Sequence, residues 1–226
     1  PYDKDIETNI PPKKEIIQSF LYLSDKIGKN KVIWRYDPIF LTDEITTDFH
    51  IKHFELLAKK LHKHTEKCII SFLDLYKGTL KNLKTVKPLD IETDTMRSLS
   101  KAISDIAKSY GLAVETCAEK IDLSDIGISH AKCVDGDLIS QICGGKIKLG
   151  KDKAQRKECG CISSTDIGAY DTCNHRCLYC YANANHDTSS KNLSSHNPNS
   201  PLLIGEIESE DKITEKNISF ERKNDT

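Results

Sequence analysis

Helical patterns and short apolar runs alternate over residues 11–119, and this alternation constrains the fold more than any other feature of the sequence. Apolar residues recur at helical spacing in three segments, 11–28, 47–64 and 94–111. Each segment is followed by a short apolar run typical of a buried strand, at 31–39, 67–76 and 112–119. This order predicts right-handed strand–helix–strand units and a parallel sheet, and therefore an α/β fold.

The number of these units limits the architecture. A complete eight-fold barrel takes about 250 residues, and the 226-residue chain contains too few units for one. We therefore predict a partial or permuted TIM-like (β/α) barrel with parallel strands over residues 1–184. The chain begins with Pro1 and its only methionine is Met96, so we expect the full-length protein to carry earlier strands. Residues 185–226 are polar and predict a largely irregular tail.

Composition and charge narrow the function classes. Lys and Arg number 33 and Asp and Glu 34, for a net charge of -1, so we predict no nucleic-acid partner. No apolar run approaches the roughly 20 residues of a membrane span, so we predict no membrane partner. The nine cysteines are an odd number, and five of them lie within 159–180. Clustered thiols in a lysine-rich chain favour a reducing, cytoplasmic environment and a metal site.

Polar residues gather where the predicted strands end. In parallel α/β folds, functional residues lie beyond the carboxyl ends of the strands. We therefore take Arg35, Asp37 and Glu115 as candidate catalytic residues. The plainer alternative is that strand ends meet solvent and carry polar side chains for that reason. Further residues at these ends are Asp74, Cys117 and Glu119.

Three cysteines are crowded into one short loop, Cys173-x3-Cys177-x2-Cys180. Three thiolates on such a loop can reach three irons of a cubane cluster and leave the fourth iron open. A structural zinc site needs four ligands, commonly from two separated C-x2-C pairs. The loop therefore predicts a [4Fe-4S] cluster, with zinc as the alternative.

Two more cysteines precede this loop within a cluster segment that we place at 159–184. Cys159 and Cys161 are separated only by Gly160. They are candidate metal ligands, and two interpretations remain open for them. They supply a second cluster together with Cys117 and Cys133, or they form a redox pair.

The stretch "CNHRCLYCY" resembles the signature loop of radical S-adenosylmethionine (SAM) enzymes, C-x3-C-x-aromatic-C, with Tyr179 in the aromatic position. The resemblance implies that the open iron binds SAM and that an electron from the cluster cleaves it. It also implies that Tyr179 lies near the adenine. An enzyme of this kind needs a substrate, which the sequence does not identify, and an electron-donor protein. In typical members the loop follows the first strand, whereas here it lies late in the chain.

A wider resemblance covers nearly the whole chain. The stretches "VIWRYDPI", "ETCAE", "CGC" and "CLYCYAN" are similar to the bacterial family called domain of unknown function 1848 (DUF1848). The cysteine cluster near the carboxyl end of that family itself resembles the radical SAM loop. Two further interpretations remain open, a structural zinc or iron–sulfur site and an electron-transfer protein without SAM chemistry.

Overall fold

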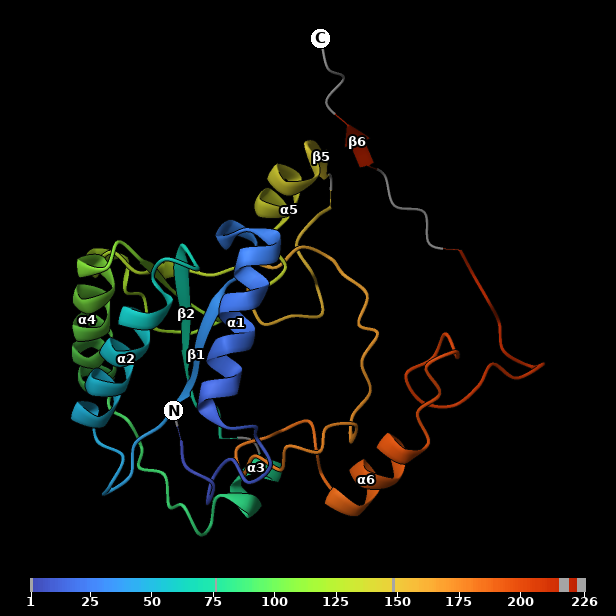
Figure 1. The fold of residues 1–226 in the computed structure, drawn as a ribbon, viewed down its shortest axis with the longest axis horizontal. Coiled ribbons are helices and arrows are strands. Elements are labelled where there is room, and N and C mark those ends of the chain that lie inside the picture. Colours follow the sequence, from blue (N-terminus) through green and yellow to red (C-terminus); the bar gives the residue numbers. More distant parts are fainter. Residues whose placement is uncertain (1, 76, 148, 216–219, 223–226) are drawn as a thin grey trace. The chain divides into compact units, whose positions relative to one another are not determined.

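A four-stranded parallel sheet in the order β1-β2-β3-β4 organises the fold (Figure 1). The computed structural model describes residues 2–75, 77–147, 149–215 and 220–222. The strands are β1 (Trp34–Ile39), β2 (Lys67–Phe72), β3 (Ala113–Thr116) and β4 (Ser129–His130). The predicted α/β fold with parallel strands is thus confirmed, but the described residues form an open sheet of four strands and not a closed barrel.

Six α-helices accompany these strands in the described part of the chain. They are α1 (Lys13–Ile27), α2 (Thr47–Leu61), α3 (Lys77–Asn82), α4 (Thr93–Ser109), α5 (Gly136–Cys143) and α6 (His186–Ser194). Two short 3-10 turns, η1 (Lys29–Lys31) and η2 (Ser124–Ile126), lead into β1 and β4. A separate two-stranded sheet pairs β5 (Gly145–Ile147) with β6 (Phe220–Arg222). None of the helices that the structure describes is long and apolar enough to cross a membrane.

The two faces of the parallel sheet differ in chemistry. On one face, side chains of β1, β2 and β3 pack against α2 and α4 in a single core. Its buried members include Trp34, Tyr36, Cys68, Ile70, Val114, Phe54, Ala58, Leu99 and Ile103. Because side chains alternate along a strand, the opposite face carries the polar residues Arg35, Asp37, Lys67 and Glu115. The sheet therefore presents one covered apolar face and one charged face.

The core includes a histidine whose two ring nitrogens both have partners. His50 of α2 is 0% exposed, and its Nδ1 lies 3.0 Å from the Tyr36 hydroxyl. Its Nε2 lies 2.9 Å from the Phe40 carbonyl oxygen. Burial lowers the pKa of His50 to about 4. The buried imidazole is therefore neutral at physiological pH and joins α2 to β1 and the residue that follows it.

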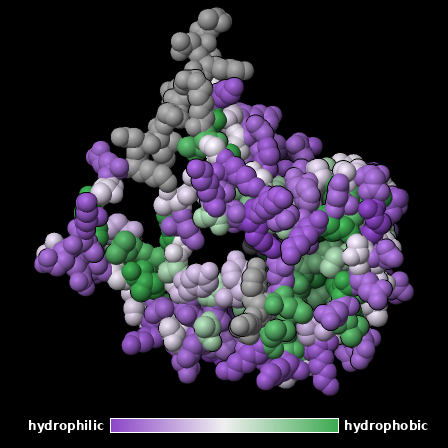
Figure 2. All heavy atoms as spheres, turned by 180° about the vertical axis from the view of Figure 1, so that it is seen from behind, coloured by the Kyte–Doolittle hydropathy of each residue, from purple (hydrophilic) through white to green (hydrophobic). Residues whose placement is uncertain are grey.

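The chain divides into two compact units. The sheet unit comprises Pro11–Asp74, Lys87–Ser163 and Glu221–Thr226, and the loop unit comprises Pro1–Ile10, Leu75–Val86 and Ser164–Phe220. Within the segment expected to be irregular, the structure contains α6, which begins after Asn185. The Asn185 side chain accepts hydrogen bonds from the backbone N–H groups of Asp187 and Thr188. Hydrophilic side chains cover much of the face shown in Figure 2.

Candidate functional site

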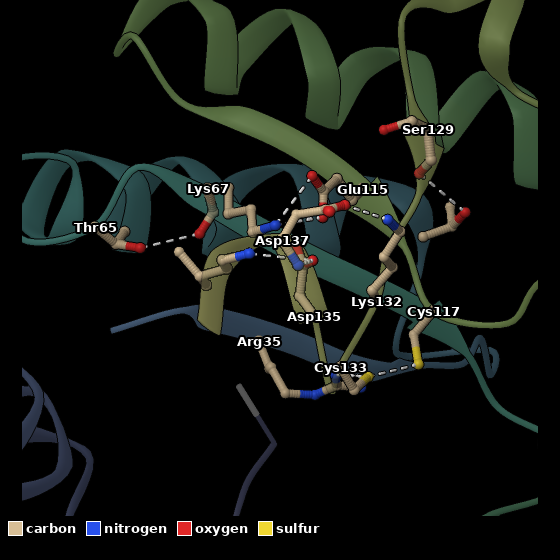
Figure 3. A network of polar contacts seen from close by, with 12 residues as sticks. Arg35, Thr65, Lys67, Glu115, Cys117, Ser129, Lys132, Cys133, Asp135 and Asp137 are labelled. Atoms are coloured by element: carbon tan, nitrogen blue, oxygen red, sulfur yellow. Dashed lines mark hydrogen bonds and ion pairs between the residues drawn. The ribbon is translucent and has the colours of Figure 1, made fainter. Parts of the chain in front are cut away.

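The first candidate group lies on the charged face of the sheet unit, where β1 carries Arg35 and Asp37. The Arg35 Nε donates to Asp37 Oδ2 at 3.0 Å, and the Arg35 Nη1 donates to the Cys133 Sγ at 3.1 Å (Figure 3). The hydroxyl of Ser71, on β2, also donates to Asp37 at 3.4 Å. Arg35 is thus held between a carboxylate and a thiol.

A pair of thiols lies beside this guanidinium. The Cys117 and Cys133 sulfurs are 3.3 Å apart (Figure 3), well beyond the roughly 2.05 Å of a disulfide, and both cysteines are free. A hydrogen bond from Cys133, with help from Arg35, lowers the pKa of Cys117 to about 6 against the opposing effect of burial. The same hydrogen bond, together with burial, raises the pKa of Cys133. The contacts of the pair therefore favour ionisation of Cys117 over Cys133.

The predicted catalytic residue Glu115 has a partner that the sequence did not reveal. Lys67 Nζ, on the neighbouring strand β2, lies 2.9 Å from a Glu115 carboxylate oxygen (Figure 3). The two side chains are 18% and 20% exposed. The β2–β3 pairing places Ile69 opposite Glu115 and Lys67 opposite Ala113, so the ion pair runs diagonally between the two strands. The two opposite charges lie on the same face of the sheet.

Glu119 lies just beyond the end of β3 and has an unusual environment. Its Oε1 accepts a hydrogen bond from the Phe72 backbone N–H at 2.8 Å. Burial, and then the negative charge of Asp74, raise the pKa of Glu119 to about 7. Asp74 itself lies 2.6 Å from Arg156. The carboxyl end of the sheet thus holds a carboxyl group that can exchange a proton near neutral pH.

Cys159 and Cys161 belong to the same unit and lie next to the thiol pair. Both are buried, at 8% and 7% exposure, in a small cluster with Ala118. Cys117 and Val134 pack against this cluster. The Val134 backbone N–H donates to the Cys161 sulfur at 3.3 Å. The structure therefore packs Cys159 and Cys161 against Cys117, and Cys117 lies beside Cys133.

The second candidate group is the cysteine loop of the loop unit. Asp171 closes the base of the loop, since its N–H donates to the Ala182 carbonyl at 2.9 Å. Its Oδ1 accepts from the N–H groups of Ala184 and Asn185 at 2.7 and 3.1 Å. Cys173 is exposed and the other two loop cysteines are half-buried. The thiols thus lie on a short, closed segment without helix or strand.

The chain's amino-terminal residues support this loop. The N–H of Leu178 donates to the Ile6 carbonyl at 3.0 Å, and the Tyr179 hydroxyl donates to Glu7 at 2.7 Å. The Tyr179 ring lies edge-on to that of Tyr2, with centroids 6.0 Å apart. Burial, and then the hydrogen bond to Glu7, raise the pKa of Tyr179. Tyr179, the predicted aromatic residue of the loop, is therefore held both by the hydrogen bond of its hydroxyl and by the contact of its ring with Tyr2.

Buried polar atoms without a partner gather around the loop. Six such side-chain atoms occur among the described residues, and four of them lie between positions 174 and 186. These four are Asn174 Oδ1, Arg176 Nε, Asn183 Oδ1 and His186 Nδ1. Burial, and then the charges of Glu7, Cys180 and Cys173, raise the pKa of Cys177. Buried polar atoms in native proteins usually have a partner, either in the protein or in bound water or an ion, so these four atoms can accept such a partner.

The predicted site residues fall into two groups. Arg35, Asp37, Glu115, Cys159 and Cys161 belong to the sheet unit, and Cys173, Cys177, Tyr179 and Cys180 to the loop unit. In the described residues, no three His, Cys, Asp or Glu side chains form a group that could hold a metal ion as they are placed. A pocket lies at the opposite, amino end of the strands, lined by residues that include Lys29, Glu66, Lys67, Asp135 and Gln141.

Comparison with known proteins identifies the family. The model of a domain of unknown function, DUF1848, matches residues 1–182. The chain belongs to the DUF1848 family. The match covers the whole sheet up to β4, the thiol pair and the cysteine loop. Neither the curated proteins nor the solved structures contain a match to the chain.

Proposed function

We propose that this DUF1848 protein is a radical SAM-like enzyme that holds a [4Fe-4S] cluster on Cys173, Cys177 and Cys180. The observation that carries the proposal is the loop itself. It places three free thiols on one closed segment beside buried polar atoms that have no partner among the described residues. The resemblance of "CNHRCLYCY" to the radical SAM loop supplies the identity of the cofactor.

The side chains of the loop fit such a cluster. Thiolates are the usual ligands of iron–sulfur clusters, and three of them leave one iron without a protein ligand. Asn174, Arg176 and His186 each carry a buried polar atom that is available to a bound group. No fourth cysteine occurs in the loop unit, which argues against a closed four-thiolate zinc site there.

When bound, the cluster would supply the electron that cleaves SAM. The chain's own residues would bind and orient the cofactors. The resemblance implies that the Tyr179 ring would border the adenine of SAM, and the bond from its hydroxyl to Glu7 fixes that ring. Asn183 would hold the loop's shape, since its side-chain amide donates to the Cys173 carbonyl.

The helix-covered face of the sheet suits the outside of a (β/α) barrel. Helices cover the face that carries Trp34 and Tyr36, as the outer helices of a (β/α) barrel do. The opposite face carries two ion pairs, Arg35–Asp37 and Lys67–Glu115. We infer that the four strands are part of such a barrel, and that Arg35, Asp37 and Glu115 bind a polar substrate there.

The test is spectroscopic. The full chain is purified without oxygen and reconstituted with iron and sulfide, and the reduced protein is measured by electron paramagnetic resonance with and without SAM. We expect a cubane-type signal that changes when SAM is added, followed by release of deoxyadenosine. Cys177→Ser should abolish the signal, whereas Cys143→Ser, an exposed cysteine on α5, is the matched control and should retain it.

Other outcomes identify the alternatives. A cubane signal that ignores SAM would refute the SAM chemistry and support an electron-transfer protein. Zinc held by the loop cysteines, with no cluster after reconstitution, would refute the cluster and support a structural metal site.

A further inference from the structure

A second set of thiols lies in the sheet unit, apart in sequence from the loop that the proposed function uses. Cys117 follows β3, Cys133 follows β4, and Cys159 and Cys161 come from the segment after β5. We propose that these four cysteines form a tetrathiolate site for a single divalent metal ion, with zinc as the expected ion.

Backbone hydrogen bonds bring the three segments that carry these cysteines together. The N–H of Cys117 donates to the Ile70 carbonyl at 2.9 Å, and the N–H of Ala131 donates to the Thr116 carbonyl at 2.7 Å. Further along, the N–H of Ile162 donates to the Val134 carbonyl at 3.1 Å. The cysteines are therefore positioned by successive backbone pairings that extend from the sheet.

Close packing at Gly160 supports the same arrangement. A Cβ at this position would lie 3.0 Å from the Lys132 side chain and 3.7 Å from the Ala131 carbonyl oxygen. Only a glycine brings the Cys159–Cys161 turn this near to the segment that carries Cys133 without displacing that side chain. The Cys-Gly-Cys spacing thus has a geometric reason.

One sulfur–sulfur distance suits two thiolates on the same metal ion. In a tetrahedral site with zinc–sulfur bonds of about 2.3 Å, neighbouring sulfurs lie about 3.8 Å apart. The Cys117 and Cys133 sulfurs are 3.3 Å apart, close to this spacing, whereas a cubane holds its cysteine sulfurs on separate irons. Since the side chains do not yet surround one point, binding requires rotation of cysteine side chains about χ1.

Two N–H donors already point at these sulfurs. Arg35 Nη1 lies 3.1 Å from Cys133 Sγ, and the Val134 N–H lies 3.3 Å from Cys161 Sγ. Hydrogen bonds of this kind orient and stabilise metal-bound thiolates. The guanidinium also offsets part of the negative charge that four thiolates would bring to one ion.

The local packing shows why an ion would be useful here. The cluster around Cys159 and Cys161 contains only Ala118, Cys117 and Val134 besides the two cysteines. Residues 149–163 form neither helix nor strand beyond one isolated bridge. So small an apolar cluster stabilises a long irregular segment weakly, and a structural metal contributes folding free energy directly.

The test measures metal in a chain that lacks the loop ligands. In full-length protein carrying Cys173→Ser, Cys177→Ser and Cys180→Ser, we expect one zinc per chain, with four sulfurs at about 2.3 Å by X-ray absorption. Replacing Cys117 or Cys161 by Ser in this background should lower zinc affinity at least tenfold, and Cys143→Ser should leave it unchanged. Substitution with Co²⁺ should give the absorption of a tetrahedral thiolate complex, which reports the site without any assay of activity.

Three results would overturn this inference. They are a loop-deficient chain without zinc, a zinc shell of nitrogen and oxygen, and a Cys117–Cys133 disulfide in protein isolated without reductant. Because the loop cysteines are absent from the test protein, failure here leaves the proposed cluster untouched. Conversely, zinc in the loop-deficient chain, together with no cluster in the reconstituted wild-type chain, would refute only the proposed function.

Discussion

Acidification should destabilise the sheet unit through His50, the imidazole buried between α2 and β1. Its pKa is lowered from 6.5 to about 4, chiefly by burial, which the hydrogen bond with the Phe40 carbonyl opposes in part. Because the folded-state pKa is the lower one, the unfolded chain binds the proton more tightly. The stability that His50 contributes is therefore complete above pH 6.5 and is lost as the pH falls toward 4.

The size of the effect follows from these two pKa values. Between pH 7.5 and pH 4.5 the linkage amounts to about 2.5 kcal/mol of unfolding free energy. His50 is 0% exposed, so solvent screening does not reduce this figure. A loss of this size is a large fraction of the 5–15 kcal/mol typical of a folded domain.

The assay is urea unfolding followed by the fluorescence of Trp34, the only tryptophan, which is 5% exposed in the same core. The free-energy difference between wild type and His50→Gln should shrink by about 2.5 kcal/mol from pH 7.5 to pH 4.5. His130→Gln, on the exposed strand β4, retains His50 and should follow the wild type. A difference that stays constant with pH, or an imidazole resonance of His50 that titrates near pH 6.5, would refute the reasoning.

Three further experiments test the packing and the two candidate groups. Phe54→Ala removes a ring that is 0% exposed and stacked on Trp34 at 4.7 Å, and should cost about 3–5 kcal/mol by urea unfolding, whereas Leu56→Ala, at 58% exposure, should cost little. A double-mutant cycle of Lys67→Met and Glu115→Gln should give a coupling of about 1–2 kcal/mol; a coupling near zero would show that the pair is incidental. Tyr179→Phe leaves Glu7 without its phenol donor and should cost about 1–3 kcal/mol in the loop unit, read as faster proteolysis of the cysteine loop; unchanged proteolysis would contradict the support assigned to that bond.

The regular elements were predictable because their signals are local. The apolar runs 31–39, 67–76 and 112–119 contain β1, β2 and β3, and the periodic segments 11–28 and 47–64 contain α1 and α2; α4 begins one residue before the segment 94–111. Cysteine in an apolar run, as at Cys68, also indicates a core residue, and Cys68 is 0% exposed. The spacing of apolar residues is a property of a short stretch of sequence, so helices, strands and the residues they bury can be predicted from it.

Elements without a hydrophobic period escaped prediction. The helix α6 consists largely of polar residues, and its clearest signal is the cap at Asn185. The Lys67–Glu115 ion pair joins positions 48 residues apart, so it depends on the pairing of β2 with β3. Among the described residues the sheet ends at the short strand β4, Ser129–His130, and no further strand pairs with it. These residues therefore form an open sheet, whereas the sequence predicted part of a barrel.

The four thiols of the sheet unit were predicted only in part. The sequence offered two interpretations for Cys159 and Cys161, and spacing alone did not separate them. The decisive information is which segment lies beside which, and it resides in long-range backbone pairs such as Ile162 with Val134. A redox pair of Cys159 and Cys161 would need only these two thiols. A tetrathiolate site needs four, and the structure packs Cys117 against the buried pair and places the Cys133 sulfur 3.3 Å from that of Cys117. Zinc bound by four sulfurs in the loop-deficient chain would therefore support the metal site, whereas a Cys159–Cys161 disulfide without bound zinc would support the redox pair.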